Sequence, residues 1–389
     1  MNKKQKTAIR SFSGKNFILI ATSVILTFGC NKPHVNIHDL KNFKQVNLVA
    51  NSSKYHPVTV DPTLLNGFGI AWSPNGVAWV NSVGGHVSEL YSGEGAIVRN
   101  VNIPSPADTI GGLPTGIVFS GGKGFNLASG GSSFLFAGFD GVLSGWNPAS
   151  GNNAKAIKGF AGAAYTGLAI ASDKGRNLIY AANFSGKRID VWDTAFSRVI
   201  MPFVDPGIPA EYSPYNIQTV GDLLFVMYAQ LTLEGGTAGH VAGAGKGFVS
   251  VFNTDGSFVK RFASRESLNI PWGITSAPAN FLEGSDMSIK TQSENSNDTN
   301  SGSSNGSDDE LKEPVILVGN FGDGHINVFS LNGKYLGQLQ SHNQAIVIDG
   351  LWALSFPPAT ATSIDPRRLY FSAGPENEAD GLFGYLIKL

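Results

Sequence analysis

Short runs of apolar residues recur in a fixed order along most of the chain. Each unit opens with a strand-like run that carries a Gly or Asn near its beginning, and two further apolar runs follow. The first runs are NGFGIAWSP, PTGIVFS, YTGLAIAS, PYNIQTV, PWGITSA and DGLWALSF. The second runs include GVAWVNS, NLIYAANFSG and PVILVGNFGDG, and the third runs include HVSELYS, RIDVWDT and FVSVFNT. Six such units predict a circular or stacked array of small β-sheets.

The spacing of the units indicates which array this is. Matching positions in the first runs step by about 47, 51, 49, 57 and 78 residues, and a four-stranded propeller blade needs about 40 to 50. We therefore expect an all-β fold, a six-bladed β-propeller over residues 43–389. The long last step contains a Ser- and Asn-rich tract at about 284–312 that is too polar to pack, so we expect a disordered insertion in blade five. The insertion ends in acidic residues at 308–310, so binding of calcium or of a partner by this end is an alternative to a role as a simple surface loop.

A propeller has to close its ring because unpaired edge strands promote aggregation. A further strand-like run, FKQVNLVA at residues 43–50, precedes the first unit, and the last unit ends at Leu389 after its third run. We therefore expect the N-terminal strand to complete the last blade.

The N-terminus has the layout of a signal peptide. Several Lys and Arg residues precede the apolar stretch from Phe17 to Phe28, which is shorter than the roughly 20 residues of a membrane-spanning helix. The following Gly29 and Cys30 complete the sequence LTFGC, which resembles a bacterial lipobox. We expect a lipoprotein signal peptide at 1–29, a lipidated Cys30 and a polar tether at 30–42; an ordinary cleaved signal peptide is the alternative.

Composition narrows the class of protein further. The 48 Gly and 25 Phe suit many short strands joined by tight turns. The formal net charge is −1 and no long basic run is present, so nucleic acid is an unexpected partner. The sequence contains neither a G-x-S-x-G elbow nor an H-E-x-x-H motif, and Cys30 is its single cysteine. The catalytic residues are therefore unknown, and an enzyme is not the favoured class.

The repeats also resemble a family of exported bacterial proteins catalogued as conserved and of unknown function. The resemblance covers about residues 43–389 and rests on NLVA, YAANFSGKRIDVWD, PYNIQ, VMYAQ, VAGAGKGFVSVF, PWGI, VGNFGDGHINVF, IDGLWAL and LYFSAGPENEADGLFG. It implies a six-bladed propeller and brings no assigned activity. A more distant likeness to NHL-type propellers and calcium-dependent lactonases concerns the fold only.

In a propeller, the beginnings of the first strands and the ends of the second strands meet around the channel on one face, where we expect a funnel. The first strands begin with Asn66, Thr115, Thr166, Asn216, Trp272 and Asp349. The second strands end near Asn81, Asp140, Asn183, Tyr228, Asn320, Asp323, Glu376 and Glu378. The candidate ligand-contacting residues of the funnel are Asn66, Trp272, Asp323 and Glu376.

Amide and carboxylate oxygens suit a hard cation such as calcium. The candidate metal ligands are Asn183, Asn216, Asn320 and Asp349. The same residue types also form turns by bonding their own backbone, which leaves a structural role open. Similarly, Trp272 and Trp352 could either hold a ligand or pack between blades. His240, in the Gly-rich segment GHVAGAGKG, is expected to be a solvated loop side chain.

We therefore predict an exported, monomeric propeller, anchored to the membrane by lipid, that acts as a binding or interaction module for a small molecule, a glycan or a protein. Asn31 after the cysteine resembles the corresponding position of bacterial lipoproteins that are sorted to the outer membrane, and this resemblance implies the same location. The alternative is a calcium-dependent hydrolase or lactonase using the same funnel, with Asp349 or Glu376 moving the proton. A structural surface protein without a site is the third possibility.

Overall fold

The computed structural model describes residues 37–283 and 314–389, and strands dominate these ranges. The expected signal peptide, Cys30, most of the tether and the insertion expected at about 284–312 lie outside the described residues. The helical elements of the described ranges are the short 3-10 turns η1 (Ile37–Leu40), η2 (Ser53–Tyr55) and η3 (Pro148–Ser150). Within the same ranges, no helix has the length and apolar character needed to cross a membrane.

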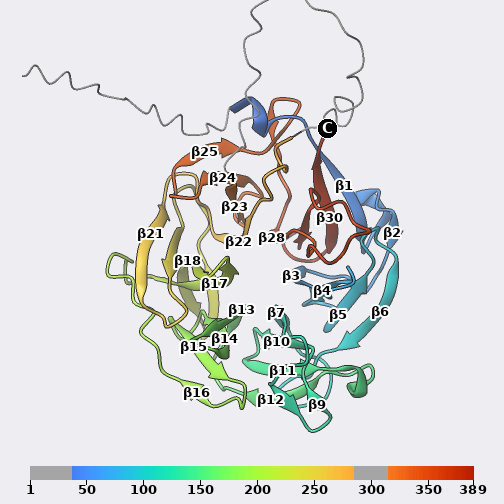
Figure 1. The fold of residues 1–389 in the computed structure, drawn as a ribbon, viewed down its shortest axis with the longest axis vertical. Helices are drawn as coiled ribbons and strands as arrows, with labels where there is room; N and C mark the ends of the chain where they lie inside the picture. The colour runs from blue at the N-terminus through green and yellow to red at the C-terminus, as the bar shows by residue number, and fades with distance from the viewer. Residues whose placement is uncertain (1–36, 284–313) are drawn as a thin grey trace, which may run out of the picture. The chain divides into compact units, whose positions relative to one another are not determined.

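The strands form six sheets arranged around a ring (Figure 1). Blade one contains β3 (Gly67–Trp72), β4 (Ala78–Ser82), β5 (Val87–Tyr91) and β6 (Ile97–Asn102). Blade two contains β7 (Pro114–Phe119), β10 (Phe134–Gly138), β11 (Val142–Trp146) and β12 (Lys155–Gly159). Blade three contains β13 (Tyr165–Asp173), β14 (Arg176–Asn183), β15 (Arg188–Asp193) and β16 (Arg198–Val199). Blade four contains β17 (Tyr212–Val220), β18 (Leu223–Glu234), β20 (Phe248–Phe252) and β21 (Phe258–Ser264). Blade five contains β22 (Pro271–Ser276), β23 (Val315–Asn320), β24 (Ile326–Ser330) and β25 (Tyr335–Gln338).

The sixth blade combines both ends of the propeller sequence. It contains β28 (Leu351–Ser355), β29 (Leu369–Ala373), β30 (Leu382–Lys388), β1 (Phe43–Ala50) and the short parallel strand β2 (Thr59–Val60). Strand β1 pairs antiparallel with β30, from Phe43 opposite Lys388 to Ala50 opposite Leu382, and the two strands lie side by side in Figure 1. The expected six-bladed propeller, closed by an N-terminal strand in its last blade, is confirmed.

Three small two-stranded pairings lie outside the blade pattern. They are β8 (Asn126–Leu127) with β9 (Gly130–Gly131), β26 (Gln340–Ser341) with β27 (Gln344–Ala345), and the far end of β18 with β19 (Thr237–His240). The last pairing makes β18 longer than the other second strands, and it becomes important at the channel.

The recurring glycine of the first strands has a steric reason. The first strands of successive blades contact one another around the channel. A Cβ atom built on Gly69 would lie 2.5 Å from the backbone oxygen of Thr115 in the next blade, and one on Gly116 would lie 2.5 Å from the backbone nitrogen of Leu168. The inner strands therefore approach each other at a distance that only glycine allows at these positions.

Apolar contacts between blades form the core. Strands β10 and β11 are buried along their whole length, whereas β12 on the outside is mostly exposed. Because neighbouring blades cover both faces of the inner strands, these strands read as continuous apolar runs without the alternation of a half-buried sheet. Aromatic pairs cross the boundaries, with Trp79 stacked on Phe134 at 4.0 Å between centroids and Trp72 against Tyr370 at 4.8 Å.

Candidate functional site

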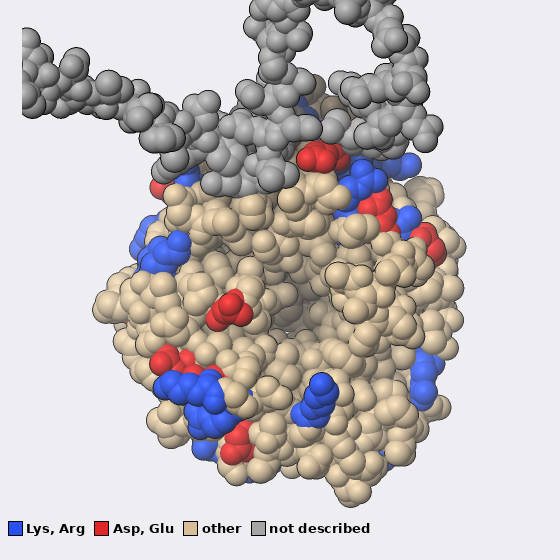
Figure 2. All heavy atoms as spheres, viewed as in Figure 1, with Lys and Arg blue, Asp and Glu red and all other residues tan. Residues whose placement is uncertain are grey.

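The six inner strands surround a channel, and the space-filling view shows the ring hollowed at its centre (Figure 2). Three aromatic side chains from three blades pack together across this channel. Phe68 stacks on Trp352 with 3.8 Å between ring centroids and meets Trp272 edge-on at 5.2 Å. Phe68 and Trp352 line one cavity, and Trp272 lines another. The aromatic cluster therefore lies between two cavities.

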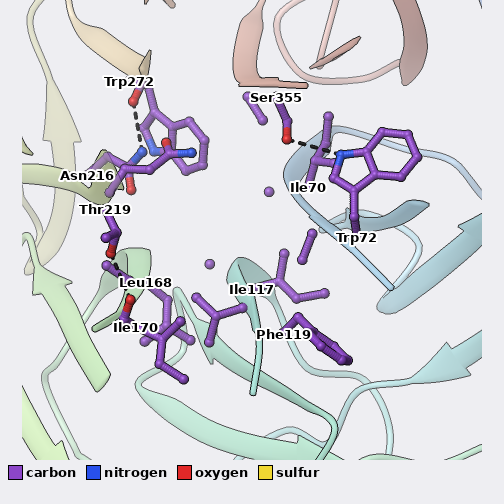
Figure 3. A pocket seen from close by; sticks show the side chains of 17 residues that line it. Ile70, Trp72, Ile117, Phe119, Leu168, Ile170, Asn216, Thr219, Trp272 and Ser355 are labelled. Atoms are coloured by element: carbon purple, nitrogen blue, oxygen red, sulfur yellow. Dashed lines mark hydrogen bonds between the residues drawn. The ribbon is translucent and has the colours of Figure 1, made fainter. Parts of the chain in front are cut away.

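The first of these, which we call the channel cavity, has a volume of about 220 Å³ and is lined by the later residues of the inner strands (Figure 3). Two of its polar side chains are engaged with the protein itself: the Asn216 amide donates to the Trp272 carbonyl at 2.8 Å, and the Thr219 hydroxyl donates to a carbonyl of β13 at 2.8 Å. Ile117, Leu168 and their neighbours complete an uncharged wall. None of the described residues that line this cavity has a titratable side chain, so these residues supply no group for acid–base chemistry.

The second cavity, which we call the hairpin cavity, has a volume of about 290 Å³. Its lining residues come from the beginnings of inner strands, from turns that follow second strands, and from the β18–β19 hairpin: Asn66, Phe68, Val83, Thr115, Phe139, Thr166, Phe184, Tyr215, Ala238, Gly239, His240, Trp352 and Glu378. This is where the sequence predicted a funnel. The hairpin cavity is the candidate functional site because it combines titratable and polar side chains with an aromatic wall.

The hairpin brings His240 to this cavity. Strand β18 continues past its blade, turns at Gly235 and Gly236, which have φ of 60° and 87°, and returns as β19. The His240 ring packs edge-on against Phe321 at 5.1 Å, and its Nδ1 lies 3.0 Å from the Tyr215 hydroxyl. Burial lowers the pKa of His240. The expectation that His240 is a solvated loop side chain is therefore wrong, since it belongs to a strand and packs against the site.

A strained turn presents Glu378. Glu376, Asn377 and Glu378 are three consecutive residues with left-handed φ angles of 57°, 55° and 69°, a conformation that costs energy for residues with a Cβ. The Asn66 amide nitrogen donates to the Glu378 carboxylate at 2.6 Å, and the Asn66 oxygen accepts from the Trp352 indole at 2.8 Å. Much of Glu378 is exposed, but its carboxylate lines the cavity, where desolvation raises its pKa.

One lining side chain has unused hydrogen-bonding capacity. The Thr166 hydroxyl is buried and has no hydrogen-bond partner, whereas the Thr115 hydroxyl, on the neighbouring inner strand, lies 2.6 and 2.9 Å from two backbone carbonyl oxygens, either of which can accept its hydrogen. Unpaired buried hydroxyls are uncommon because each loses its hydrogen bonds to water without replacement.

Of the four residues selected from the sequence for the funnel, Asn66 lines the hairpin cavity. Trp272 is 4% exposed in the wall of the channel cavity and donates its indole N–H to the Thr166 carbonyl. Asp323 accepts hydrogen bonds from the Asn320 amide and from a backbone N–H of its own turn. Glu376 is exposed and pairs with Lys54 at 3.3 Å. Three of the four therefore lie outside the hairpin cavity.

The four candidate metal ligands belong to different blades. The Asn183 oxygen accepts from the Gly186 N–H at 2.9 Å, and the Asn216 oxygen accepts from the next backbone N–H at 2.8 Å. The Asn320 amide donates to a backbone carbonyl, and exposed Asp349 accepts from the Glu376 N–H. Among the described residues no three His, Cys, Asp or Glu side chains group as metal ligands. Calcium binding by these four residues stays a prediction.

Thr166 and Glu378 were expected at the funnel from the sequence but were not among the candidate ligand-contacting residues. Tyr215 and His240 were not expected there. A signal for the hairpin is present: LTLE and TAGH flank the pair Gly235-Gly236, a combination that favours a two-residue β-hairpin turn. The sequence contains no pattern that would place this hairpin beside the cavity.

Comparison with known proteins finds no matching family model. Two curated relatives are the uncharacterised proteins L690 and R648 of Acanthamoeba polyphaga mimivirus. The first is 36% identical over 296 residues, covering 71% of this chain and 67% of L690. The second is 35% identical over 236 residues, covering 58% of this chain and 48% of R648, so this chain spans about half of that relative.

Solved structures with a similar arrangement include a virginiamycin B lyase from Staphylococcus aureus and a gluconolactonase from Xanthomonas campestris. The lyase has a TM-score of 0.48 and 11% identity, covering 89% of this chain and 99% of the lyase. The gluconolactonase has a TM-score of 0.46 and 12% identity, covering 83% and 86%. Similarities this low carry no chemistry over to this chain. The identity to L690, by contrast, extends over two thirds of both sequences, and the chain belongs to the same uncharacterised protein family as L690.

Proposed function

We propose that this protein is a binding protein that holds a small organic molecule in the hairpin cavity, and that it works in the cell envelope, anchored by a lipid on Cys30. The observation that supports binding is the convergence of Asn66, Thr166, His240 and Glu378 on one largely aromatic cavity. Small-molecule sites have this character: a concave apolar wall with a few polar groups that set the orientation of the ligand.

The cavity size and the Glu378 carboxylate agree with such a role. A volume of about 290 Å³ lies near the lower end of the range for ligand sites, so the ligand is small. The Glu378 carboxylate lines the cavity and receives one hydrogen bond from Asn66. A ligand that donates to this carboxylate would recover part of the hydrogen bonding that desolvation removes.

The binding proposal is tested by filling the cavity. Ala238 lines it, whereas Thr237, the preceding residue of β19, is exposed on the other face of the strand. A fragment library is screened by NMR on protein with labelled alanine methyl groups. We expect fragments to shift the Ala238 methyl in the wild type and in Thr237→Phe, and to lose affinity in Ala238→Phe. Fragments that bind equally to all three proteins, or none that shift this methyl, would argue against a site here.

Export and anchoring rest on the sequence features of residues 1–30. Under this proposal the protein is made in a bacterial cell, Cys30 receives the lipid and Asn31 directs the protein to the outer membrane. Cells expressing the wild type or Cys30→Ser are fed an alkyne-labelled fatty acid and fractionated. We expect label and outer-membrane location for the wild type and neither for the variant; an unlabelled wild-type protein would contradict the proposal.

One observation favours an acid–base enzyme as a second candidate. The same cavity contains His240, whose pKa burial lowers, and Glu378, whose pKa desolvation raises. An imidazole and a carboxyl group in one cavity can act as general base and general acid toward a ligand. The calcium-dependent hydrolase or lactonase that the sequence left as the alternative would be a member of this class, with His240 and Glu378 in place of Asp349 or Glu376. A panel of lactones and esters is assayed with wild type and His240→Asn, and turnover that only the wild type supports would favour the enzyme.

A further inference from the structure

The charges around the hairpin cavity are unbalanced. Among the lining residues within the described ranges, Glu378 is the one acid, and neither Lys nor Arg is present. His240 does not balance this carboxylate, because burial favours its neutral form. The direct partner of the Glu378 carboxylate is the neutral amide of Asn66. An ionised Glu378 therefore faces the cavity without a counter-charge from the cavity wall.

The neighbouring turn adds negative charge. Asp349, Glu376 and Asp380 lie on or against the same turn as Glu378, and Asp349 accepts the backbone N–H of Glu376. Lys54 lies 2.6 Å from Asp380 and 3.3 Å from Glu376, so two carboxylates already share its charge. Clustered charges of one sign attract ions of the other sign to a nearby cleft.

We propose that the ligand of the hairpin cavity is a compact organic ammonium ion whose charged nitrogen pairs with the Glu378 carboxylate. This inference rests on the proposed function, since it names the chemical class of the small molecule bound there. The ammonium group supplies the counter-charge that the cavity wall lacks, and the carbon atoms of the ligand contact the aromatic wall.

The cost of burying the Glu378 carboxylate favours a cation over other ligands of this size. Burying a carboxylate is costly unless it is paired, and a cation restores the interaction that desolvation removes. A neutral ligand leaves the charge uncompensated, and an anion adds repulsion. Aromatic rings further attract cations where a ring face is free. Phe139, a half-buried wall residue, and Phe184 and Tyr215 also provide apolar surface for methyl and methylene groups.

The experiment compares choline with 3,3-dimethyl-1-butanol, which has the same shape and no charge. Binding is measured by calorimetry and by the shift of the labelled Ala238 methyl in the wild type, Glu378→Gln and Glu376→Gln. Glu376 is the matched control because it adds to the charge of the same turn but is exposed and outside the cavity, so it separates direct pairing with Glu378 from the general charge of the turn. We expect choline to bind the wild type and Glu376→Gln at least about tenfold more tightly than the alcohol, which corresponds to about 1.4 kcal/mol. In Glu378→Gln we expect this preference to disappear.

The outcomes separate this inference from the proposed function. If choline and the alcohol shift the Ala238 methyl with equal affinity, the ammonium inference fails and the binding function stands. If choline, tetramethylammonium and methylammonium all leave the wild type unchanged, the ammonium inference fails, and the fragment screen decides the binding function separately. A preference for choline that survives in Glu378→Gln also overturns the inference. Thermal unfolding midpoints of the variants show whether each remains folded.

Discussion

Asp61 and Glu89 share a single hydroxyl group across the boundary between blade six and blade one. The Thr63 hydroxyl oxygen lies 2.6 Å from Asp61 Oδ1 and 2.5 Å from Glu89 Oε1. Asp61 follows the outer strand of blade six, and Glu89 lies in β5 of blade one. A hydroxyl has one hydrogen to donate, so two such short contacts require that one carboxyl group carries a proton. Burial, together with the nearby charge of Asp61, raises the pKa of Glu89 to about 7.

This pair makes stability depend on pH. The pKa of Glu89 rises from 4.5 to about 7 on folding, so the folded protein binds the proton more tightly. Its stabilising contribution is complete below pH 4.5 and is lost as pH rises toward 7. We expect the free energy of unfolding to fall by up to about 3 kcal/mol over this window. Urea unfolding at several pH values tests this.

The matched variants are Glu89→Gln, which keeps the shape of the side chain without the titration, and Glu211→Gln at an exposed position. Glu89→Gln should flatten this part of the pH profile and be more stable than the wild type near pH 7. Glu211→Gln should retain the wild-type profile. A Glu89→Gln protein with an unchanged pH profile would show that this carboxyl group does not titrate in the window.

The close approach of inner strands predicts a strong effect of a single methyl group. In Gly116→Ala the added Cβ would lie 2.5 Å from the backbone of β13, whereas in Gly159→Ala, in the outer strand of the same blade, it meets open space. We expect Gly116→Ala to lower the free energy of unfolding by about 1 to 3 kcal/mol. Gly159→Ala should change it little. Equal stability of the two variants would contradict the steric explanation.

The unpaired hydroxyl of Thr166 predicts a gain in stability when it is removed. Thr166→Val replaces a buried hydroxyl without a partner by a methyl group, so we expect a gain of about 1 kcal/mol. Thr115→Val removes a hydroxyl that has two backbone carbonyls within hydrogen-bonding distance and should lower stability by a similar amount. Urea unfolding of both variants tests this comparison, and a loss in Thr166→Val would indicate an unseen partner.

The raised pKa of Glu378 predicts how ammonium binding varies with pH. Desolvation raises this pKa above its ordinary value of 4.5, so at low pH the carboxyl group is protonated and cannot pair with a cation. Choline affinity should therefore rise with pH through the raised pKa and then level off. Calorimetry in buffers of different protonation enthalpy should detect proton release below the plateau. Affinity that is constant from pH 4 to 8 would exclude Glu378 as the partner.

Much of the fold could be predicted because propeller packing requires apolar residues and glycines at regular positions along the sequence. The buried second strand β10, FLFAG, is apolar throughout because two blades cover it. The inner-strand glycines recur because each faces the backbone of the next blade. The outer strands, such as β12 and the two-residue β16, could not be recognised, since an exposed edge strand needs few apolar residues and therefore leaves no apolar run in the sequence.

The site was less predictable because its members come from separate blades. Asn66 could be placed at the funnel from its position before an inner strand. His240 could not, because its place depends on β18 extending past its blade so that the hairpin reaches Phe321 and Tyr215. The role of Glu378 likewise depends on three consecutive left-handed residues that point its carboxylate toward Asn66.

The sequence by itself determined the number of blades, the order of their strands and the use of residues 43–50 to close the ring. These properties follow from apolar runs, turn residues and their spacing, which act over short distances along the chain. Tertiary structure alone decided which polar side chains share a cavity, which oxygens remain unpaired and which carboxyl groups retain a proton. Those properties depend on desolvation and on distances between residues far apart in sequence, as for Asn66 and Glu378, and no local pattern encodes them.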